Sequence, residues 1–377
     1  MGEYVVAGLV IETPVRTPVR AGVSVCGWTG CHPWAVAVDL SVVTRQVGHA
    51  GDSIRDEGTS EHALVRRWQM DDVKEDRGSQ RAGYVTLVGR PNAGKSTLMN
   101  ALVGERLSIV TPKAQTTWQR VTGLRTEDDV QAVFLDTPGL LDVRDLHQRA
   151  MLEAAHQALR EADLVLVLLD GTSGRDPVED AAIQTALAEV PSGIPVRGLL
   201  TKVDAQDREY VPDRVSRLSE GLGIPVFPIS SETGEGLEEL WNEIVSHLPE
   251  HPFYFPESDL ATQPVRFFVE EFVRETVFEL YQEEIPWSVI ARIEEFREGE
   301  DPVYVLVHLY VDRKSQKGII LGKKGHAVRE LGTRAREKVE AFLGRRVYLD
   351  LWVKVLPGWR RKRGALSRFG FHVPEDA

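Results

Sequence analysis

The feature that most constrains this chain is a phosphate-binding motif, Gly-Arg-Pro-Asn-Ala-Gly-Lys-Ser, at residues 89–96. It follows an apolar run at 84–88 and precedes a helical pattern at 95–102. Its glycines let backbone N–H groups converge on phosphate oxygens, and the helix adds the positive end of its dipole. A G-x-x-x-x-G-K-S loop between a strand and a helix therefore predicts an α/β domain that binds a nucleoside triphosphate.

The chain after residue 84 reads as apolar strands that alternate with helices. Such a pattern is typical of a parallel sheet covered on both faces. Only one phosphate loop and no internal repeat occur, so we expect a single domain of this kind over residues 80–249. The further strands are expected at 130–135, 164–169, 196–200 and 226–229, and the helices at 148–161, 178–189 and 236–248.

A Pro- and aromatic-rich stretch ends this pattern, and we interpret residues 250–264 as an extended linker. Beyond it, the patterns predict a smaller α+β domain over residues 265–377. Its expected order is helix 265–280, strand 288–298, strand 303–311, glycine loop, helix 327–343 and strand 346–355.

Residues 1–79 show no sustained helical or alternating period, and 48–78 are polar and charged. We expect a disordered N-terminal extension. Two alternatives stay open: the natural start is Met70, shortly before the first strand, or the segment is a regulatory tail.

The charge distribution points to an anionic partner for the second domain. The whole chain carries −12, which taken alone argues against a nucleic-acid binder. Residues 313–368, however, hold 17 basic and 4 acidic side chains, so the rest of the chain carries −25. A basic block on an acidic body suggests that this block binds an anion.

Two cysteines, Cys26 and Cys31, are too few for a disulfide framework and fit a reducing cytosol. The longest apolar runs are far shorter than the roughly 18 residues that a membrane span needs.

Chemistry assigns roles to the first two nucleotide motifs. Lys95 would reach the β- and γ-phosphates, and the Ser96 hydroxyl would ligate Mg²⁺. Asp-Thr-Pro-Gly at 136–139 begins 40 residues after Ser96. Asp136 would hold Mg²⁺ through water, and the Gly139 N–H would sense a γ-phosphate. Alone this string is a common turn, but its spacing from the phosphate loop favours the nucleotide interpretation.

The third motif, Thr-Lys-Val-Asp at 201–204, would recognise the base. The Asp204 carboxylate can accept two hydrogen bonds from the N1–H and N2–H₂ edge of guanine, which adenine lacks. Lys202 would lie along the base and ribose, and Ser230-Ser231-Glu232 would offer N–H groups to the guanine O6. The three motifs in this order resemble translation-factor-like GTPases. Thr201 stands where the base motif more often has Asn, as in Rho-type G domains, which puts one supporting hydrogen bond in question.

A switch loop is expected at 112–117, Pro-Lys-Ala-Gln-Thr-Thr, between the first helix and the second strand. Thr117 would complete the Mg²⁺ shell, with Thr116 as the second choice. The predicted metal ligands are Ser96, Thr117 and Asp136, and the predicted catalytic residues are Lys95, Thr117 and Asn92. The predicted GTP-binding residues are Gly89, Arg90, Pro91, Asn92, Ala93, Gly94, Lys95, Ser96, Thr97, Asp136, Thr137, Pro138, Gly139, Thr201, Lys202, Val203, Asp204, Ser230, Ser231 and Glu232.

Hydrolysis should be slow without help. Leu140 follows the Asp-Thr-Pro-Gly motif, where Ras-like enzymes carry a Gln that orients water, and leucine cannot hydrogen-bond water. With Asn92 in the phosphate loop, this G domain resembles those that bind K⁺ beside the β- and γ-phosphates. That ion would act in place of an arginine finger. The alternative is that Asn92 only shapes the loop.

Gly322-Lys323-Lys324-Gly325 stands between an apolar run and a helix, inside the basic block. KH domains use such a G-x-x-G loop to clamp single-stranded backbone, because the two glycines allow close approach. The alternative is a helix-initiating turn. The run Arg360-Arg-Lys-Arg363 is either an RNA or membrane-surface contact or a solvated tail.

Several longer strings extend these motifs. Arg-Ala-Gly-Tyr ends at Tyr84 and leads into the phosphate loop, and the switch string follows at 112–117. Glu283-Glu-Ile-Pro-Trp-Ser, Ile293-Glu-Glu-Phe and Gln316-Lys-Gly-Ile-Ile-Leu-Gly-Lys-Lys-Gly come later. Together they resemble the Era family of bacterial ribosome-assembly GTPases over roughly residues 81–370. Trp118 stands where that family usually has Arg, and residues 1–79 lie outside the resemblance.

The resemblance implies an Era-type G domain that cycles between GTP and GDP with Mg²⁺, followed by a type II KH domain. It implies that the KH domain binds the 3′ end of 16S rRNA and assists 30S subunit assembly. It also implies a peripheral contact with the cytoplasmic membrane. We further expect a monomer in the cytoplasm. Other interpretations are an RNA-binding module that uses nucleotide only for folding, a tandem G-domain ribosome GTPase, and a membrane-associated regulatory GTPase whose basic tail binds lipid.

Overall fold

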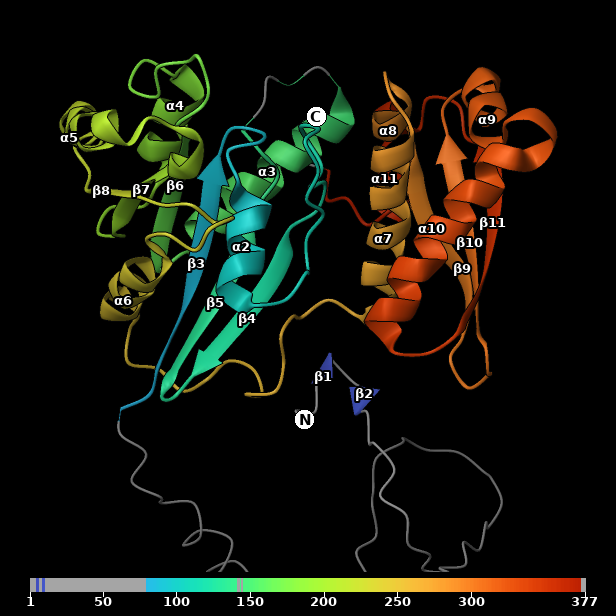
Figure 1. Cartoon of the computed structure of the whole chain (residues 1–377), viewed down its shortest axis with the longest axis horizontal. Helices are drawn as coiled ribbons and strands as arrows, with labels where there is room; N and C mark the ends of the chain where they lie inside the picture. Colours follow the sequence, from blue (N-terminus) through green and yellow to red (C-terminus); the bar gives the residue numbers. More distant parts are fainter. Residues whose placement is uncertain (1–4, 7–8, 11–78, 141–142, 144, 374–377) are drawn as a thin grey trace, which may run out of the picture. The chain divides into compact units, whose positions relative to one another are not determined.

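The computed structural model describes residues 5–6, 9–10, 79–140, 143 and 145–373 (Figure 1). The expectation for residues 1–79 therefore falls almost wholly outside the described residues. Within that stretch, β1 (Val5–Val6) and β2 (Leu9–Val10) form an antiparallel pair. None of the helices in the described part of the chain is long and apolar enough to serve as a membrane span.

A six-stranded sheet carries the first domain (Figure 1). Its strands are β3 (Arg81–Gly89), β4 (Val121–Glu127), β5 (Val130–Asp136), β6 (Leu164–Asp170), β7 (Val196–Thr201) and β8 (Val226–Pro228). They lie in the order β4-β5-β3-β6-β7-β8, and every neighbouring pair except β4–β5 is parallel. The predicted mostly parallel α/β domain is confirmed. The edge strand β4 was not predicted, because its sequence has no continuous apolar run.

Helices cover both faces of this sheet. They are α2 (Lys95–Val103), α3 (Leu146–Arg160), α4 (Ala181–Glu189), α5 (Val211–Leu222) and α6 (Leu237–His247). Strand β6 shows the arrangement, since Leu164 and Leu166 pack into the core that contains residues of α2 and α6, whereas Val165 and Val167 pack with residues of α3, α4 and α5. A strand buried on both sides must be apolar at every position, which explains its unbroken hydrophobic run.

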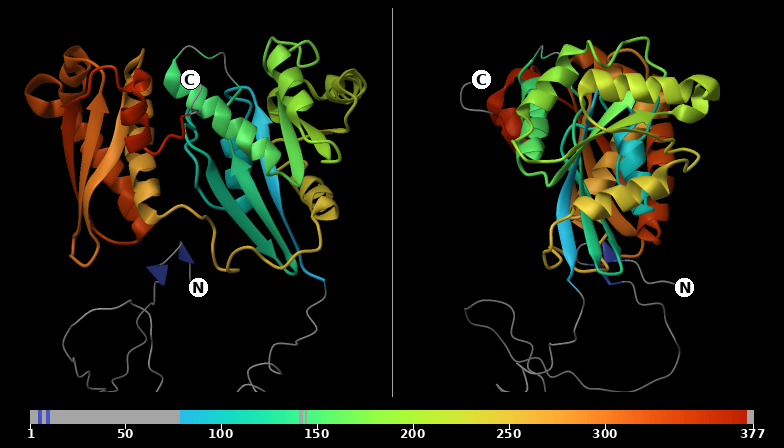
Figure 2. Two further views of the ribbon diagram at one scale, coloured as in Figure 1. Left: turned by 180° about the vertical axis from the view of Figure 1, so that it is seen from behind. Right: turned by 90° about the vertical axis from the view of Figure 1, so that its left-hand side faces the viewer.

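The second domain is a three-stranded sheet with helices. Its elements are α7 (Val265–Leu280), α8 (Ile285–Ser288), β9 (Ile290–Arg297), β10 (Val303–Val311), α9 (Lys314–Leu321), α10 (His326–Leu343), β11 (Val347–Val355) and α11 (Arg363–Arg368). Strand β10 pairs antiparallel with β9 and parallel with β11. Alternate β10 residues, such as Val305 and Val307, are buried in a core shared with α7 and α10. The views in Figure 2 show both long helices on the same side of the sheet. The predicted smaller α+β KH domain is confirmed.

Three helices of this domain were not predicted, the first of which is the four-residue α8. Helix α9 precedes the glycine loop where only an apolar run was noted, and α11 follows the basic run at 360–363. The run is anchored at its start, because Trp359 is fully buried and Arg360 forms an ion pair with Asp145 at 2.9 Å, whereas Arg361 and Lys362 are exposed to solvent.

The segment interpreted as a linker packs along the G domain. The side-chain oxygen of Gln131 accepts hydrogen bonds from the N–H groups of Tyr254 and Phe255, and the Leu124 N–H donates to the Leu260 carbonyl. The chain between the two domains is thus extended but bonded to β4 and β5.

Candidate functional site

The phosphate loop lies between β3 and α2. Gly94 adopts a left-handed conformation (φ 98°) as the residue before α2, and a Cβ at Gly89 would stand 2.7 Å from the Leu168 carbonyl oxygen. Both positions therefore require glycine. The Lys95 ammonium is buried and donates to the carbonyls of Gly89 and Arg90 at 3.1 and 3.0 Å. Burial lowers the pKa of Lys95 to about 8, opposed by the nearby Asp136 carboxylate. An anionic phosphate at this place would relieve the desolvation of the lysine.

Three oxygen-bearing side chains meet beside Lys95. The Ser96 hydroxyl donates to Oδ2 of Asp136 at 2.7 Å and lies 3.0 Å from Oγ1 of Thr117, which in turn is 3.3 Å from the same carboxylate oxygen. Burial raises the pKa of Asp136. Its other oxygen, Oδ1, is buried and has no hydrogen-bond partner among the described residues. A hard cation such as Mg²⁺ prefers this all-oxygen donor set, and the orphaned carboxylate oxygen fits such an ion.

A cavity of about 650 Å³ brings the predicted parts together. Its walls come from the phosphate loop, residues 109–111, the switch loop at 112–117, Gly139, Lys202 and Glu232. Asp204, Ser230 and Ser231 do not line it but adjoin Lys202 and Glu232 in the chain. Motifs more than 100 residues apart in sequence thus surround one space.

The base motif is tied to the phosphate loop by Thr201. Its hydroxyl donates to the Ala93 carbonyl at 2.9 Å, so a hydrogen bond from this position to the loop is present with Thr in place of Asn. Lys202 is left-handed (φ 58°), and its ammonium lies 2.8 Å from the Asp170 carboxylate. Val203 is buried and Asp204 is exposed in the short helix Val203–Ala205. The turn places the Asp204 carboxylate where solvent or a ligand reaches it.

The Asp-Thr-Pro-Gly motif packs tightly on the phosphate loop. A Cβ at Gly139 would stand 2.7 Å from the Pro91 nitrogen, and the Thr137 hydroxyl donates to the Leu87 carbonyl at 2.7 Å. Leu140 is buried in the sheet core, and its N–H donates to the Gly89 carbonyl at 3.0 Å. Its side chain packs inward, where it makes no polar contact.

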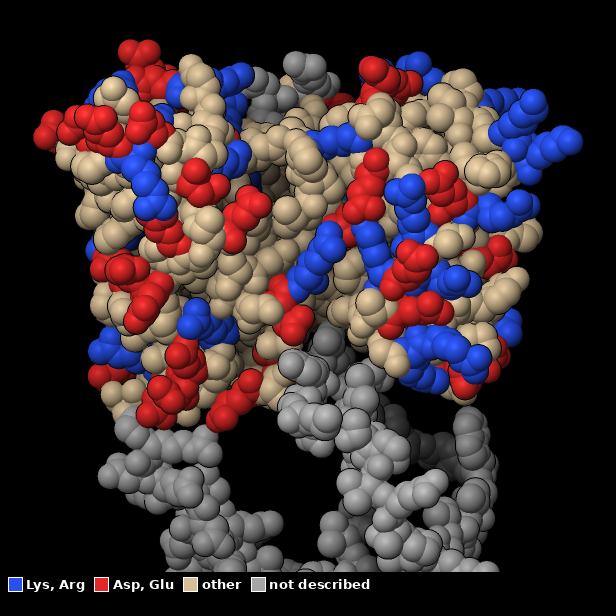
Figure 3. All heavy atoms as spheres, in the orientation of Figure 1, with Lys and Arg blue, Asp and Glu red and all other residues tan. Residues whose placement is uncertain are grey.

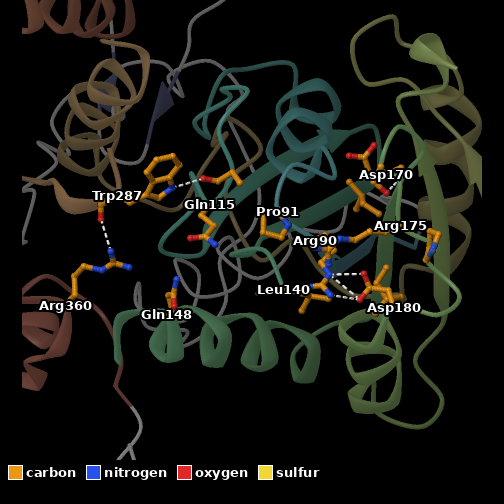
Figure 4. A pocket seen from close by; sticks show the side chains of 15 residues that line it. Arg90, Pro91, Gln115, Leu140, Gln148, Asp170, Arg175, Asp180, Trp287 and Arg360 are labelled. Carbon is orange, nitrogen blue, oxygen red and sulfur yellow. Dashed lines mark hydrogen bonds and ion pairs between the residues drawn. The ribbon is translucent and has the colours of Figure 1, made fainter. Parts of the chain in front are cut away.

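Sequence reasoning missed two partners of the predicted residues. Asp170 holds Lys202, and Asp180 forms a two-pronged ion pair with Arg90 of the phosphate loop at 2.7 Å (Figure 4). Asp170 was within reach of sequence analysis, because it ends an apolar strand and ligand sites lie at the carboxyl ends of parallel strands. Asp180 stands outside any recognised motif, and only the fold brings it to Arg90.

A second cavity of about 520 Å³ is lined by Arg90 and Pro91 of the phosphate loop, among others (Figure 4). The KH domain contributes Trp287 and Arg360 to its wall. The Trp287 indole N–H donates to the Ala114 carbonyl at 2.9 Å. Residues of the switch loop thus line both cavities, and a KH side chain holds the loop backbone.

The Gly-Lys-Lys-Gly loop joins α9 to α10. Gly322 and Gly325 both have positive φ (67° and 76°), and Lys323 and Lys324 are exposed between them. Lys and Arg side chains gather over the end of the KH domain that carries α9 (Figure 3). A groove of about 440 Å³ starts at Gly325 and is lined by Arg329, Arg336 and Tyr348 among others. An exposed basic loop at the mouth of a groove fits a single-stranded polyanion.

His147 on α3 is buried in an aromatic cluster with Trp118, Trp359 and Phe371. Neither ring nitrogen has a hydrogen-bond partner among the described residues. Burial, with help from Arg360 and Arg274, holds the pKa of His147 well below its usual range. The folded protein therefore keeps this ring neutral.

We expect this histidine to make the fold sensitive to acid. Because its pKa is depressed in the folded state, its stabilising effect is full above the unfolded pKa near 6.5 and is lost as the pH falls below it. One such group gives a slope of at most about 1.4 kcal/mol per pH unit. Urea unfolding of His147→Phe at about pH 7.5 and 5.5 should show a flatter pH dependence than the parent. Exposed His372→Phe is the control, and an unchanged slope in His147→Phe contradicts the prediction.

Two family models match the chain. Residues 84–202 match the model described as a 50S ribosome-binding GTPase, and residues 284–360 match a KH domain model. The chain is 39% identical over 296 residues to the GTPase Era of Halothermothrix orenii, covering 78% of this chain and 99% of that protein. It is also 39% identical over 301 residues to the GTPase Era of Aquifex aeolicus, covering 77% and 99%.

Solved structures agree with the sequence matches. A single-substitution variant of Aquifex aeolicus Era bound to GDP and AlF₄⁻ superposes with a TM-score of 0.74 at 38% identity, covering 78% of this chain and all of that one. Era in complex with MgGDPNP and nucleotides 1506–1542 of 16S ribosomal RNA gives 0.73 at 37% identity, again over 78% and 100%. In both cases the match spans a G domain and a KH domain in one chain.

Proposed function

The chain belongs to the Era family of GTPases, and on that premise we propose that its nucleotide state governs binding of 16S rRNA by its KH domain during assembly of the 30S subunit. It hydrolyses GTP to GDP and phosphate. One observation supports the proposal most. The side chains of Ser96, Thr117 and Asp136 converge beside Lys95, in the same chain as an exposed Gly-Lys-Lys-Gly loop at a groove.

The proposed GTP site follows from these positions. The N–H groups of residues 89–94 and the Lys95 ammonium would bind the phosphates, and Thr97 would lie beside them in the first turn of α2. Asp204 would accept hydrogen bonds from guanine, Lys202 would lie along the guanine ring, and the backbone N–H groups of residues 230–232 would bond the guanine O6. Mg²⁺ would be held by Ser96 and Thr117 directly and by Asp136 through water, and it would neutralise charge between the phosphates.

Catalysis in this site would depend on positioning and charge neutralisation. Lys95 would stabilise the charge that develops on the phosphate oxygens, and Thr117 would fix the metal in the GTP state. The buried Leu140 would not orient water. Slow intrinsic hydrolysis is therefore expected, and a cation near the β- and γ-phosphates would raise the rate.

We expect hydrolysis to be faster in K⁺ than in Na⁺. The Asn92 amide nitrogen donates to the Pro112 carbonyl at 3.1 Å, so the Asn92 side chain lies between the phosphate loop and the switch loop. Steady-state hydrolysis in matched KCl and NaCl buffers should differ by about tenfold if one charge-stabilising contact is gained. Asn92→Ala should abolish the difference, while Asn242→Ala, exposed on α6, should keep it. Equal rates in both salts for the parent protein would contradict the proposal.

The proposed RNA contact is the loop at Gly322-Lys323-Lys324-Gly325. The glycines would admit the RNA backbone, the lysines would neutralise phosphates, and the adjoining groove would take bases. The acidic G domain offers less attraction for a polyanion, so the KH domain should supply most of the affinity.

Crosslinking in cells tests the function as a whole. The protein is captured after ultraviolet crosslinking, and the attached RNA is sequenced. Enrichment of the 3′ end of 16S rRNA is the expected result.

A pull-down at graded salt with RNA or with anionic vesicles tests whether the basic block binds lipid instead. Capture by vesicles alone, without rRNA in cells, would replace the ribosomal role by a membrane role. Cytoplasmic location, a peripheral membrane contact and a monomeric state stay predictions.

A further inference from the structure

We infer that Arg274, on the first helix of the KH domain, is a positioning residue for GTP hydrolysis. It holds the residues on both sides of Thr117 and thereby keeps the Thr117 hydroxyl at the magnesium site. The inference rests on the proposed role of Thr117 as a metal ligand. It makes the KH domain part of the structure that builds the nucleotide site.

The contacts of Arg274 are direct and buried. Its side chain is 3% exposed, and one terminal nitrogen donates to the Thr116 carbonyl at 2.5 Å. Its guanidinium carbon lies 4.6 Å from the centre of the Trp118 ring. Glu271, one turn earlier on α7, accepts two hydrogen bonds from the same guanidinium at 2.9 and 2.5 Å. Because the guanidinium is planar and held from behind, it fixes the direction of both contacts.

Thr117 lies between the two residues that Arg274 holds. Its hydroxyl oxygen lies 3.0 Å from the Ser96 hydroxyl and 3.3 Å from the Asp136 carboxylate. A displacement of the Thr116 carbonyl or the Trp118 ring would therefore carry the Thr117 hydroxyl away from the other two oxygens. Arg274 of the KH domain therefore acts on the proposed magnesium ligand Thr117 through its two chain neighbours, Thr116 and Trp118.

Other KH groups dock the rest of the switch loop in the same way. The Lys113 ammonium donates to the carbonyls of Phe278 and Tyr281 near the end of α7. Trp287 donates to the Ala114 carbonyl (Figure 4), and the Gln119 amide donates to the Phe369 carbonyl at 2.8 Å. The loop thus cannot move Thr117 out of the site without breaking contacts with the KH domain. By linkage, a ligand that favours the docked loop also favours this placement of the KH domain.

Trp118 makes the contact with Arg274 possible. It is 4% exposed and packs against His147 on α3 and Trp359 of the KH domain. An aromatic face attracts a guanidinium, whereas an arginine at position 118 would place a second cation against Arg274. The aromatic ring at position 118 therefore attracts the Arg274 guanidinium, which an arginine at that position would repel.

The test uses the full chain and compares Arg274→Met with Arg106→Met. Arg106 forms an ion pair at 2.5 Å with Glu275, the next residue on α7, so its replacement loosens the same domain contact without touching the switch loop. GTP hydrolysis is measured across a Mg²⁺ titration, and nucleotide binding is measured separately in EDTA. Arg274→Met should raise the Mg²⁺ concentration for half-maximal kcat by about tenfold, which corresponds to removal of one charge-assisted hydrogen bond.

The other readouts separate positioning from folding. Binding in EDTA should stay unchanged, because the phosphate loop is untouched, and Arg106→Met should leave the Mg²⁺ midpoint within about twofold. Trp118→Ala should shift the midpoint in the same direction, and the double variant should shift it no further, because both residues act through one loop. Arg274→Lys should fall between the parent and Arg274→Met.

An unchanged Mg²⁺ midpoint in Arg274→Met, or additive shifts in the double variant, would overturn the inference. If Arg274→Met does not fold, Trp118→Ala and Arg274→Lys carry the test alone. A parent protein that binds GTP but shows no Mg²⁺-dependent hydrolysis would instead contradict the proposed function, so the two failures are distinguishable.

Discussion

Asp204→Asn is expected to weaken GTP binding by about 2–4 kcal/mol, because a carboxylate that accepts two hydrogen bonds from guanine becomes an amide with one donor and one acceptor. That corresponds to roughly a 30- to 1000-fold loss of affinity. Xanthine carries an oxygen where guanine carries its N2 amino group, so the Asn amide donor fits it. The variant should therefore prefer xanthosine triphosphate over GTP.

Competition against a fluorescent guanine nucleotide measures this exchange directly. Asp204 is exposed and follows a turn that Lys202 and Val203 define, so its replacement should not disturb folding. Asp207→Asn is the matched control. Asp207 lies three residues further on and caps the short helix Arg208–Tyr210 by accepting from the Glu209 N–H. Unchanged GTP affinity in Asp204→Asn would remove Asp204 from the base site.

Replacing both loop glycines, Gly322→Asp with Gly325→Asp, is expected to eliminate RNA binding by the full chain. Carboxylates in the loop would block the close approach of the backbone and repel its phosphates. The two positions differ in the structure. A Cβ at Gly322 would stand 2.6 Å from the Ala327 Cβ, whereas a Cβ at Gly325 would meet nothing within 4 Å. Gly325→Asp alone therefore tests RNA contact with the least change to the fold.

A matched control exists at the other end of α10. Gly344 also has positive φ (63°) and open space around a Cβ, but it lies beyond the C-terminal end of the helix. Gly344→Asp should bind single-stranded RNA as the parent does. Lys323→Ala with Lys324→Ala should weaken binding and flatten its salt dependence by at most about 0.7 for each RNA phosphate that these lysines no longer neutralise. Full binding by Gly325→Asp at low salt would show that the RNA contact lies elsewhere.

The sequence was informative wherever a function depends on neighbouring residues. The phosphate loop is a local strand–loop–helix, so its eight residues were sufficient to predict it. The other nucleotide motifs each follow an apolar strand, and the carboxyl ends of parallel strands meet at one edge of a sheet. In the structure, Lys202 lines the same cavity as Lys95, and Asp136 accepts a hydrogen bond from Ser96, the residue after Lys95.

Two of the elements that sequence analysis missed, β4 and α11, have no continuous apolar run of their own. Strand β4 is an edge strand with polar residues along part of its length, and its antiparallel pairing with β5 comes from the turn between them. Helix α11 is buried through Leu366 against residues that lie far away in the chain. A short, mostly polar segment gains its helical structure from packing on a surface that no local period reveals.

The sequence by itself determined the fold class, the family, the nucleotide motifs and the glycine loop, because each of them depends on short stretches of consecutive residues. Only the tertiary structure decided how the KH domain meets the switch loop. Arg274 and the Thr116 carbonyl are 158 residues apart, and Trp118, His147 and Trp359 come from three separate segments of the chain. Contacts of this kind depend on the packing of finished elements, since side chains select partners by shape and charge only after the chain has brought them together.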